Sequence, residues 1–182
     1  MKLTLMIFVG LVVGVVALNF VGGMFIGEIT TDIEIPEVGY DSSAESGKPA
    51  PYFNLSSLGE ENISLSDLSG APLVLTFWTT WNTLAADQVK ILDDYLSRVG
   101  NNGPRVVIIS SQEDKATVAN FIKRGGYALD SLLDELGVVT EHYSAHNQPV
   151  TYFIDATGIV QDVFVGVLSE KMLEEKLEQL IR

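Results

Sequence analysis

The stretch PLVLTFWTTWNTLAADQV, residues 72–89, decides the fold of this chain. Residues 72–78 form a continuous apolar run, which is typical of a β-strand buried on both faces of a sheet. From Ala85 onward the apolar side chains recur at helical spacing, so we expect a helix over residues 83–98. A buried strand that leads within a few residues into an amphipathic helix indicates an α/β domain.

The flanking sequence continues this alternation of strands and helices. Strand patterns occur at residues 51–58, 63–68 and 105–110, and twice within residues 150–166. Helix patterns occur at residues 113–126, weakly at residues 134–144, and after Ser169, which is a plausible N-cap. The order β-β-β-α-β-α-(α)-β-β-α predicts an α/β sandwich whose parallel core ends in an antiparallel hairpin and a helix.

The N-terminal end predicts a membrane anchor. Residues 3–27 carry no charge, are long enough to span a bilayer, and lack a convincing cleavage site, although a cleaved signal peptide stays an alternative. Because Lys2 precedes this run and the next basic residue is Lys48, we expect a cytoplasmic N-terminus and an extracytoplasmic domain. The chain then divides into a transmembrane signal-anchor (1–27), an acidic flexible tether (28–48) and a folded domain (49–182).

Composition excludes several classes of function. The formal net charge of −13 argues against nucleic-acid binding. The chain has no cysteine, which excludes disulfides, thiol nucleophiles and thiolate metal sites. His142 and His146 have a spacing that can bind metal on a helix, but no third ligand is evident. We therefore expect neither a metal nor a cofactor.

Three segments carry a resemblance to a known family: APYFNLSSLGEENISLSDLSGAPLVLTFWTTW (50–81), PVTYFIDATGIV (149–160) and GVLSEKMLEEKL (166–177). In this order they resemble the membrane-anchored thioredoxin-like proteins of the TlpA/ResA type, within the redoxin/AhpC-TSA group. The resemblance covers residues 49–182. It implies a thioredoxin-like three-layer sandwich with a mixed central sheet and a cis-proline at Pro149.

The catalytic motif of that family is absent here. The family carries Cys-x-x-Cys directly after the second tryptophan, where this chain has Asn82, Thr83, Leu84 and Ala85. By resemblance, Asn82 stands in the place of the attacking cysteine and Ala85 in that of the resolving one. Gln88 stands where some members carry a proton-handling glutamate. We therefore predict no catalytic residue, despite the resemblance to thiol-disulfide oxidoreductases.

The altered site keeps features of a binding groove. Asparagine is a good helix N-cap, so Asn82 either caps the following helix or offers its amide to a ligand. Redox relatives lay an extended peptide beside the cis-proline, and backbone pairing of that kind needs no sulfur. The predicted groove consists of Trp78, Trp81, Asn82, Thr83, Leu84, Ala85, Gln148 and Pro149.

Several functions fit these observations. The first is a non-catalytic module that binds a protein or peptide partner at the outer membrane face. The second is a structural or assembly component whose groove is vestigial, or simply a relative that shares the oxidoreductase fold without the activity. The third is an enzyme of another kind, which would require Asp87 and His146 to approach each other across a pocket.

Overall fold

The computed structural model describes residues 44–100 and 103–180. The predicted anchor (1–27) lies outside the described residues, and so does the predicted tether as far as residue 43. Within the described part, no helix is both long enough and apolar enough to cross a membrane.

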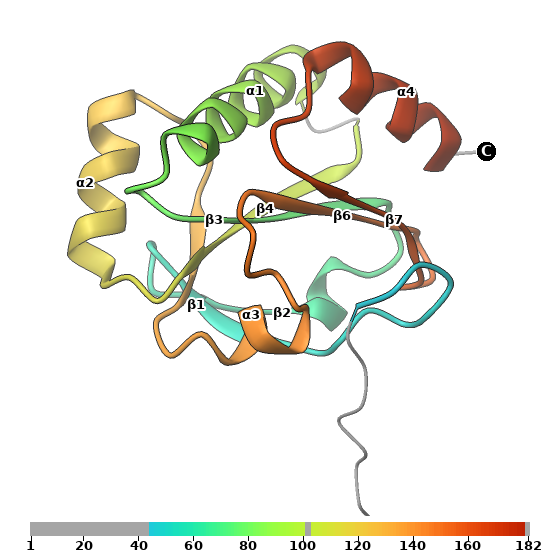
Figure 1. The fold of residues 1–182 in the computed structure, drawn as a ribbon, viewed down its shortest axis with the longest axis horizontal. Helices are drawn as coiled ribbons and strands as arrows, with labels where there is room; N and C mark the ends of the chain where they lie inside the picture. The colour runs from blue at the N-terminus through green and yellow to red at the C-terminus, as the bar shows by residue number, and fades with distance from the viewer. Residues whose placement is uncertain (1–43, 101–102, 181–182) are drawn as a thin grey trace, which may run out of the picture. The chain divides into compact units, whose positions relative to one another are not determined.

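A seven-stranded mixed sheet forms the centre of the domain, with strand order β2-β1-β5-β4-β3-β6-β7 (Figure 1). The strands are β1 (Asn54–Ser57), β2 (Asn62–Ser64), β3 (Leu73–Trp78), β4 (Arg105–Ser111), β5 (Ser131–Asp134), β6 (Val150–Ile154) and β7 (Val160–Val165). Strand β3 pairs in parallel with β4 and antiparallel with β6. Strand β3, which comes from the segment that decides the fold, is therefore an interior strand of the sheet.

Helices cover both faces of this sheet. They are α1 (Thr83–Val99), α2 (Lys115–Gly125), α3 (Val138–His142) and α4 (Glu170–Leu180), with a short 3-10 turn at Leu65–Leu68. Figure 1 shows α1 and α4 on one side of the sheet and α3 on the other. Buried residues of α2 pack in the same apolar cluster as those of α1 and α4. The result is a three-layer α/β sandwich.

The apolar run of β3 explains why two cores form. Leu73, Leu75 and Phe77 belong to the core on the α3 side, whereas Val74 and Trp78 belong to the core under α1 and α4. Successive side chains of a strand point to opposite faces, so a strand covered on both sides is buried along its whole length and is mostly apolar. All six residues of β3 are buried.

One strand was not predicted from the sequence. Strand β5 is only four residues long, SLLD, and lies between β1 and β4, antiparallel to the first and parallel to the second. All four residues are buried. A four-residue run with serine and aspartate at its ends shows no clear period, so the expected element order lacked this strand.

A pair of buried hydroxyl groups links the two central strands that run antiparallel. Thr76 of β3 lies opposite Thr151 of β6, and their Oγ1 atoms are 2.9 Å apart. Both side chains are fully buried. Each hydroxyl therefore has the other as its hydrogen-bond partner inside the sheet.

This hydroxyl pair can be tested with valine, which has nearly the shape of threonine. We expect Thr76→Val alone to lower the free energy of unfolding by about 1–3 kcal/mol, because the Thr151 hydroxyl stays buried without a partner. The double variant Thr76→Val with Thr151→Val should recover most of this loss. Urea unfolding provides the measurement, and two additive losses would contradict the pairing.

Two buried tyrosines join the end of α3 to the rest of the core. The Tyr143 hydroxyl donates to the Pro51 carbonyl oxygen at 2.8 Å, and the Tyr152 hydroxyl donates to the Tyr143 carbonyl oxygen. Burial raises the pKa of the Tyr143 phenol well above its usual value and raises the pKa of Tyr152 to about 12. The folded chain therefore holds both phenols neutral at a pH where the unfolded chain ionises them.

Alkaline pH should consequently destabilise the fold. An unfolded tyrosine ionises near pH 10, so the contribution of Tyr152 to stability is present below about pH 10 and is lost as the pH rises to about 12. We expect urea midpoints to fall across this window. The urea midpoint should fall less steeply with pH in the Tyr152→Phe variant than in the native chain. If the midpoints of the two chains fell equally, Tyr152 would not be the residue responsible.

Candidate functional site

The start of α1 is fixed by the side chain of Asn82. Its Oδ1 accepts a hydrogen bond from the Leu84 backbone N–H at 3.0 Å, which confirms that Asn82 caps the helix. Its Nδ2 donates to the carbonyl oxygen of Gln148 at 2.7 Å. The two partners fix the orientation of the amide, because a backbone N–H only donates and a carbonyl only accepts.

Gln148 lies two residues before the start of β6, and the peptide bond between Gln148 and Pro149 is cis. The Pro149 side chain is buried, and its carbonyl oxygen accepts from the Gly166 backbone N–H at 2.8 Å. Asn82 uses one of the two lone pairs of the Gln148 carbonyl oxygen. A peptide that pairs with the backbone here would have to use the other.

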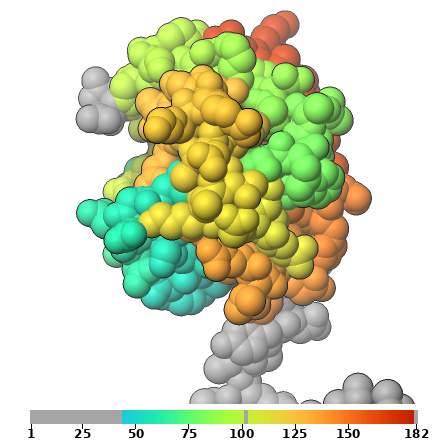
Figure 2. All heavy atoms as spheres, turned by 90° about the vertical axis from the view of Figure 1, so that its left-hand side faces the viewer, coloured from blue at the N-terminus to red at the C-terminus, as the bar shows by residue number. Residues whose placement is uncertain are grey.

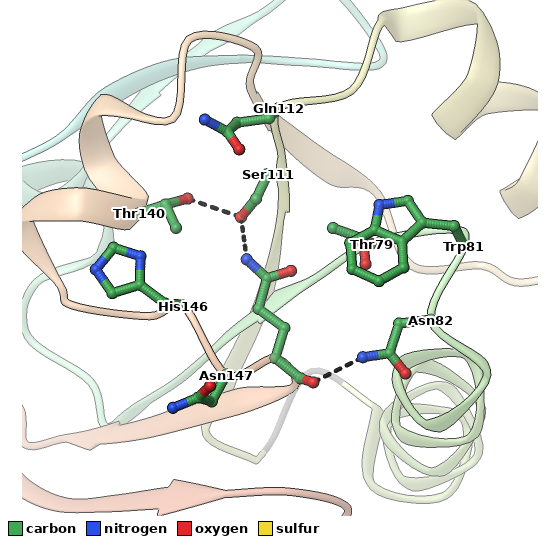
Figure 3. Close-up of a pocket in the computed structure, with 9 residues that line it drawn as sticks. Thr79, Trp81, Asn82, Ser111, Gln112, Thr140, His146 and Asn147 are labelled. Atoms are coloured by element: carbon green, nitrogen blue, oxygen red, sulfur yellow. Dashed lines mark hydrogen bonds between the residues drawn. The ribbon is translucent and has the colours of Figure 1, made fainter.

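A pocket of about 450 Å³ opens beside this link. It is lined by Thr79, Trp81, Asn82, Ser111, Gln112, Thr140, His146, Asn147 and Gln148 (Figure 3). Figure 2 faces this part of the surface, where the start of α1 (green), the residues after β4 (yellow) and the segment between α3 and β6 (orange) meet. Apart from Trp81 and His146, the lining consists of amide and hydroxyl side chains.

A chain of hydrogen bonds runs behind the pocket. Gln148 Nε2 donates to Ser111 Oγ at 2.7 Å, and the hydroxyls of Ser111 and Thr140 are 2.7 Å apart (Figure 3). Thr140 Oγ1 donates to the buried Asp134 carboxylate at 2.7 Å. Because the Thr140 hydrogen goes to Asp134, the Ser111 hydroxyl donates to Thr140, and every bond in the chain points toward the carboxylate.

The predicted groove residues separate into exposed, pocket-lining and buried ones. Trp81 is 75% exposed and Leu84 is 55% exposed. Of the predicted residues, Trp81, Asn82 and Gln148 line the pocket. Thr83 is exposed but lies outside the lining, and Pro149 is buried.

Two of the predicted groove residues were placed wrongly. Trp78 is 0% exposed; its Nε1 lies 3.3 Å from Ser131 Oγ, and its ring packs against Phe121. Ala85 is also completely buried, on the inner face of α1. Trp78 belongs to the core between the sheet and helices α1, α2 and α4, and Ala85 of the first turn of α1 belongs to the same core.

Sequence reasoning missed most of the polar lining. Thr79, Ser111, Gln112, Thr140 and Asn147 were not predicted as site residues. A usable indication existed, because Thr79 follows β3 and Ser111 ends β4, and these neighbouring strands are parallel. In open α/β sheets, ligands bind outside the carboxyl ends of such strands.

Gln88 acts as a structural tie. Its side chain is fully buried, and its Oε1 accepts from the Leu168 backbone N–H at 2.6 Å. It thereby joins α1 to the segment that precedes α4. Its Nε2 has no partner among the described groups.

The residues considered for an enzyme or a metal site do not come together. His146 lines the pocket, but Asp87 is exposed and lies outside the lining. Helix α3 ends at His142, so His146 does not continue its helical spacing. Among residues 44–100 and 103–180, no group of three or more His, Cys, Asp or Glu side chains could hold a metal ion.

Comparison with known proteins places this geometry in a family. The model of the AhpC/TSA family matches residues 46–163. The chain belongs to the AhpC/TSA family. The resemblance derived from its sequence is thereby confirmed, and the chain contains no cysteine.

Similar curated proteins are thioredoxin-like. The thioredoxin-like protein YneN of Bacillus subtilis is 27% identical over 74% of this chain and 79% of its own length. The thiol-disulfide oxidoreductase ResA of the same organism is 29% identical over 73% and 74%. The thiol:disulfide interchange protein DsbE of Pseudomonas fluorescens is 29% identical over 72% of each chain.

Solved structures agree on the fold. A putative thiol:disulfide interchange protein DsbE from Chlorobium tepidum superposes with a TM-score of 0.67 at 24% identity, covering 76% of this chain and 96% of its own. StoA from Bacillus subtilis gives a TM-score of 0.61 at 19% identity, covering 69% and 96%. The domain is therefore a thioredoxin-like α/β sandwich.

The double role of Asn82 predicts a graded series of variants. Asn82→Ala removes both the helix cap and the link to Gln148, and should lower the free energy of unfolding by about 1–3 kcal/mol. Asn82→Asp keeps a cap acceptor at the helix N-terminus but has no N–H for the Gln148 carbonyl oxygen. We expect it to fall between the native chain and Asn82→Ala in urea unfolding. An aspartate variant as stable as the native chain would show that the link contributes nothing.

Proposed function

We propose that this chain is a membrane-anchored, extracytoplasmic member of its family that binds a protein or peptide partner without redox chemistry. The partner would contact the surface at the start of α1 and the pocket beside it. The predicted anchor at residues 1–27 would hold the domain at the outer face of the membrane.

The observation that carries the proposal is the exposure of two large apolar side chains at a site without sulfur. Trp81 and Leu84 flank Asn82 in sequence and are both more than half exposed. Aromatic side chains that stay exposed beside a pocket are enriched at protein interfaces. The relatives ResA and DsbE are named for thiol–disulfide chemistry, which this chain cannot perform because it has no thiol.

A second candidate is a structural or assembly component with a vestigial groove. The bond from Asn82 Nδ2 to the Gln148 carbonyl oxygen favours it, because this bond occupies a backbone acceptor next to the cis-proline. In that case the domain would act through its anchor and tether, and the pocket would be left over from a redox ancestor.

Site-specific photo-crosslinking separates the two candidates. A photoreactive side chain would replace Leu84 in the full-length chain, and a matched probe would replace Glu178, an exposed residue of α4. In membranes of the cells that make the protein, we expect a defined partner to be captured from position 84 and not from position 178.

A second change sharpens this experiment. Trp81→Ala in the Leu84 probe protein should reduce the yield of the captured product, because the indole would form part of the contact. The structural role would be favoured if the two probe positions captured the same products. It would also be favoured if Trp81→Ala left the yield of the captured product unchanged.

A further inference from the structure

We infer that the pocket binds one side chain of the bound peptide and selects for a primary amide, that of asparagine or glutamine. The inference rests on the proposed function and adds a ligand chemistry to it. Its basis is a pair of buried hydrogen-bonding atoms that have no partner among the described residues and that belong to two pocket-lining side chains, Thr79 and Gln148.

The first atom is Gln148 Oε1, whose position is fixed by its neighbours. Gln148 Nε2 donates to Ser111 Oγ at 2.7 Å and to the Ala145 carbonyl oxygen at 3.1 Å. The carbonyl only accepts, so the nitrogen of the amide must lie on that side. Oε1 therefore points the other way, as an acceptor without a partner among the residues that the structure describes.

The second atom is Thr79 Oγ1. Thr79 follows β3 directly, is only 3% exposed, and has no hydrogen-bond partner for its hydroxyl among the described groups. Buried polar groups are nearly always satisfied, so each exception calls for an explanation. Two such exceptions in the lining of one pocket indicate that a ligand supplies the missing partners.

The chain of hydrogen bonds behind Gln148 strengthens its free acceptor. Each donor from Gln148 Nε2 through Ser111 and Thr140 points toward the Asp134 carboxylate. Hydrogen bonds in such a series polarise one another. Electron density is thereby shifted toward Gln148 Oε1, which becomes a better acceptor for an N–H group.

The lining disfavours charged ligand groups, and its one titratable side chain, His146, lies 3.6 Å from the Glu141 carboxylate. None of the residues that line the pocket is a carboxylate, lysine or arginine. A buried ammonium would lack a countercharge, and a buried carboxylate would face the Gln148 acceptor. A primary amide fits both atoms: one N–H serves Gln148 Oε1, and the second N–H or the amide oxygen serves the Thr79 hydroxyl.

Access to the two atoms requires a small opening of the pocket. Both are shielded from solvent in the free protein. The side chains of Trp81, Gln112 and Asn147 at the pocket are exposed, so they can rotate without disturbing the core. Binding would therefore change the surroundings of Trp81 while leaving those of the buried Trp78 unchanged.

This difference between the two tryptophans provides the measurement. The full-length chain, labelled with 5-fluorotryptophan in detergent, has one fluorine signal from Trp81 and one from Trp78 as internal reference. The probes are capped peptides Ser-Val-Xaa-Val-Ser, in which Xaa is Gln, Glu, Met or Lys. Their C-terminus is an N-methylamide, so the glutamine side chain carries the sole primary amide.

We expect the Gln peptide to shift the Trp81 signal with an affinity about three- to tenfold above that of the Met peptide, the worth of one or two neutral hydrogen bonds. The Glu and Lys peptides should bind more weakly than the Gln peptide. Equal affinities across the set would overturn the inference, as would no shift from any peptide at millimolar concentration.

Variants of two neighbouring threonines supply a matched control. Thr79→Val removes a hydroxyl that has no partner, so it should leave the thermal midpoint unchanged or raise it, while abolishing most of the preference for Gln over Met. Thr76→Val removes a paired hydroxyl outside the pocket, so it should lower the midpoint and keep the preference. A Thr79→Val variant that loses stability and keeps the preference would overturn the inference.

The inference and the proposed function fail in different ways. If the peptides bind with equal affinity while the Leu84 probe still captures a partner, the site is a peptide-binding groove whose pocket does not select for an amide. If the Leu84 and Glu178 probes behave alike, the proposed function itself is wrong.

Discussion

The side-chain amide of Asn82 is the interaction on which the site depends. One end of it satisfies a free N–H at the start of α1, and the other end holds the carbonyl oxygen that precedes the cis-proline. In this way a single residue positions the helix and the loop before β6 relative to each other. The carboxamide suits this double role because it holds an acceptor and a donor in fixed positions on one planar group.

Three neutral side chains connect elements of the fold in this region. Thr76 pairs its hydroxyl with Thr151, Gln88 links α1 to the segment before α4, and Asn82 links the start of α1 to the residue before the cis-proline. Each connection is a hydrogen bond of an uncharged group and needs neither a carboxylate nor a thiol. The architecture of the fold is therefore compatible with the proposed role in binding.

The sequence predicted those parts of the structure that follow from periodicity. The apolar run of β3, the stripe of α1 and the cap at Asn82 each have a local cause, and each is present. Strand β5 was missed because four residues carry too little pattern. Trp78 was wrongly assigned to the groove. In a strand that is covered on both faces, the alternation of side chains does not show which of two nearby tryptophans reaches solvent.

The polar lining of the pocket could not be predicted for a different reason. Thr76 and Thr79 are the same residue type in one continuous segment. The Thr76 hydroxyl has a partner across the sheet, whereas the Thr79 hydroxyl has none within residues 44–100 and 103–180. The difference arises because Thr76 lies opposite Thr151 inside the sheet, whereas Thr79 has passed the end of β3. Burial without a partner lowers stability, so a residue of this kind at the carboxyl edge of a sheet is better explained by a ligand than by the fold.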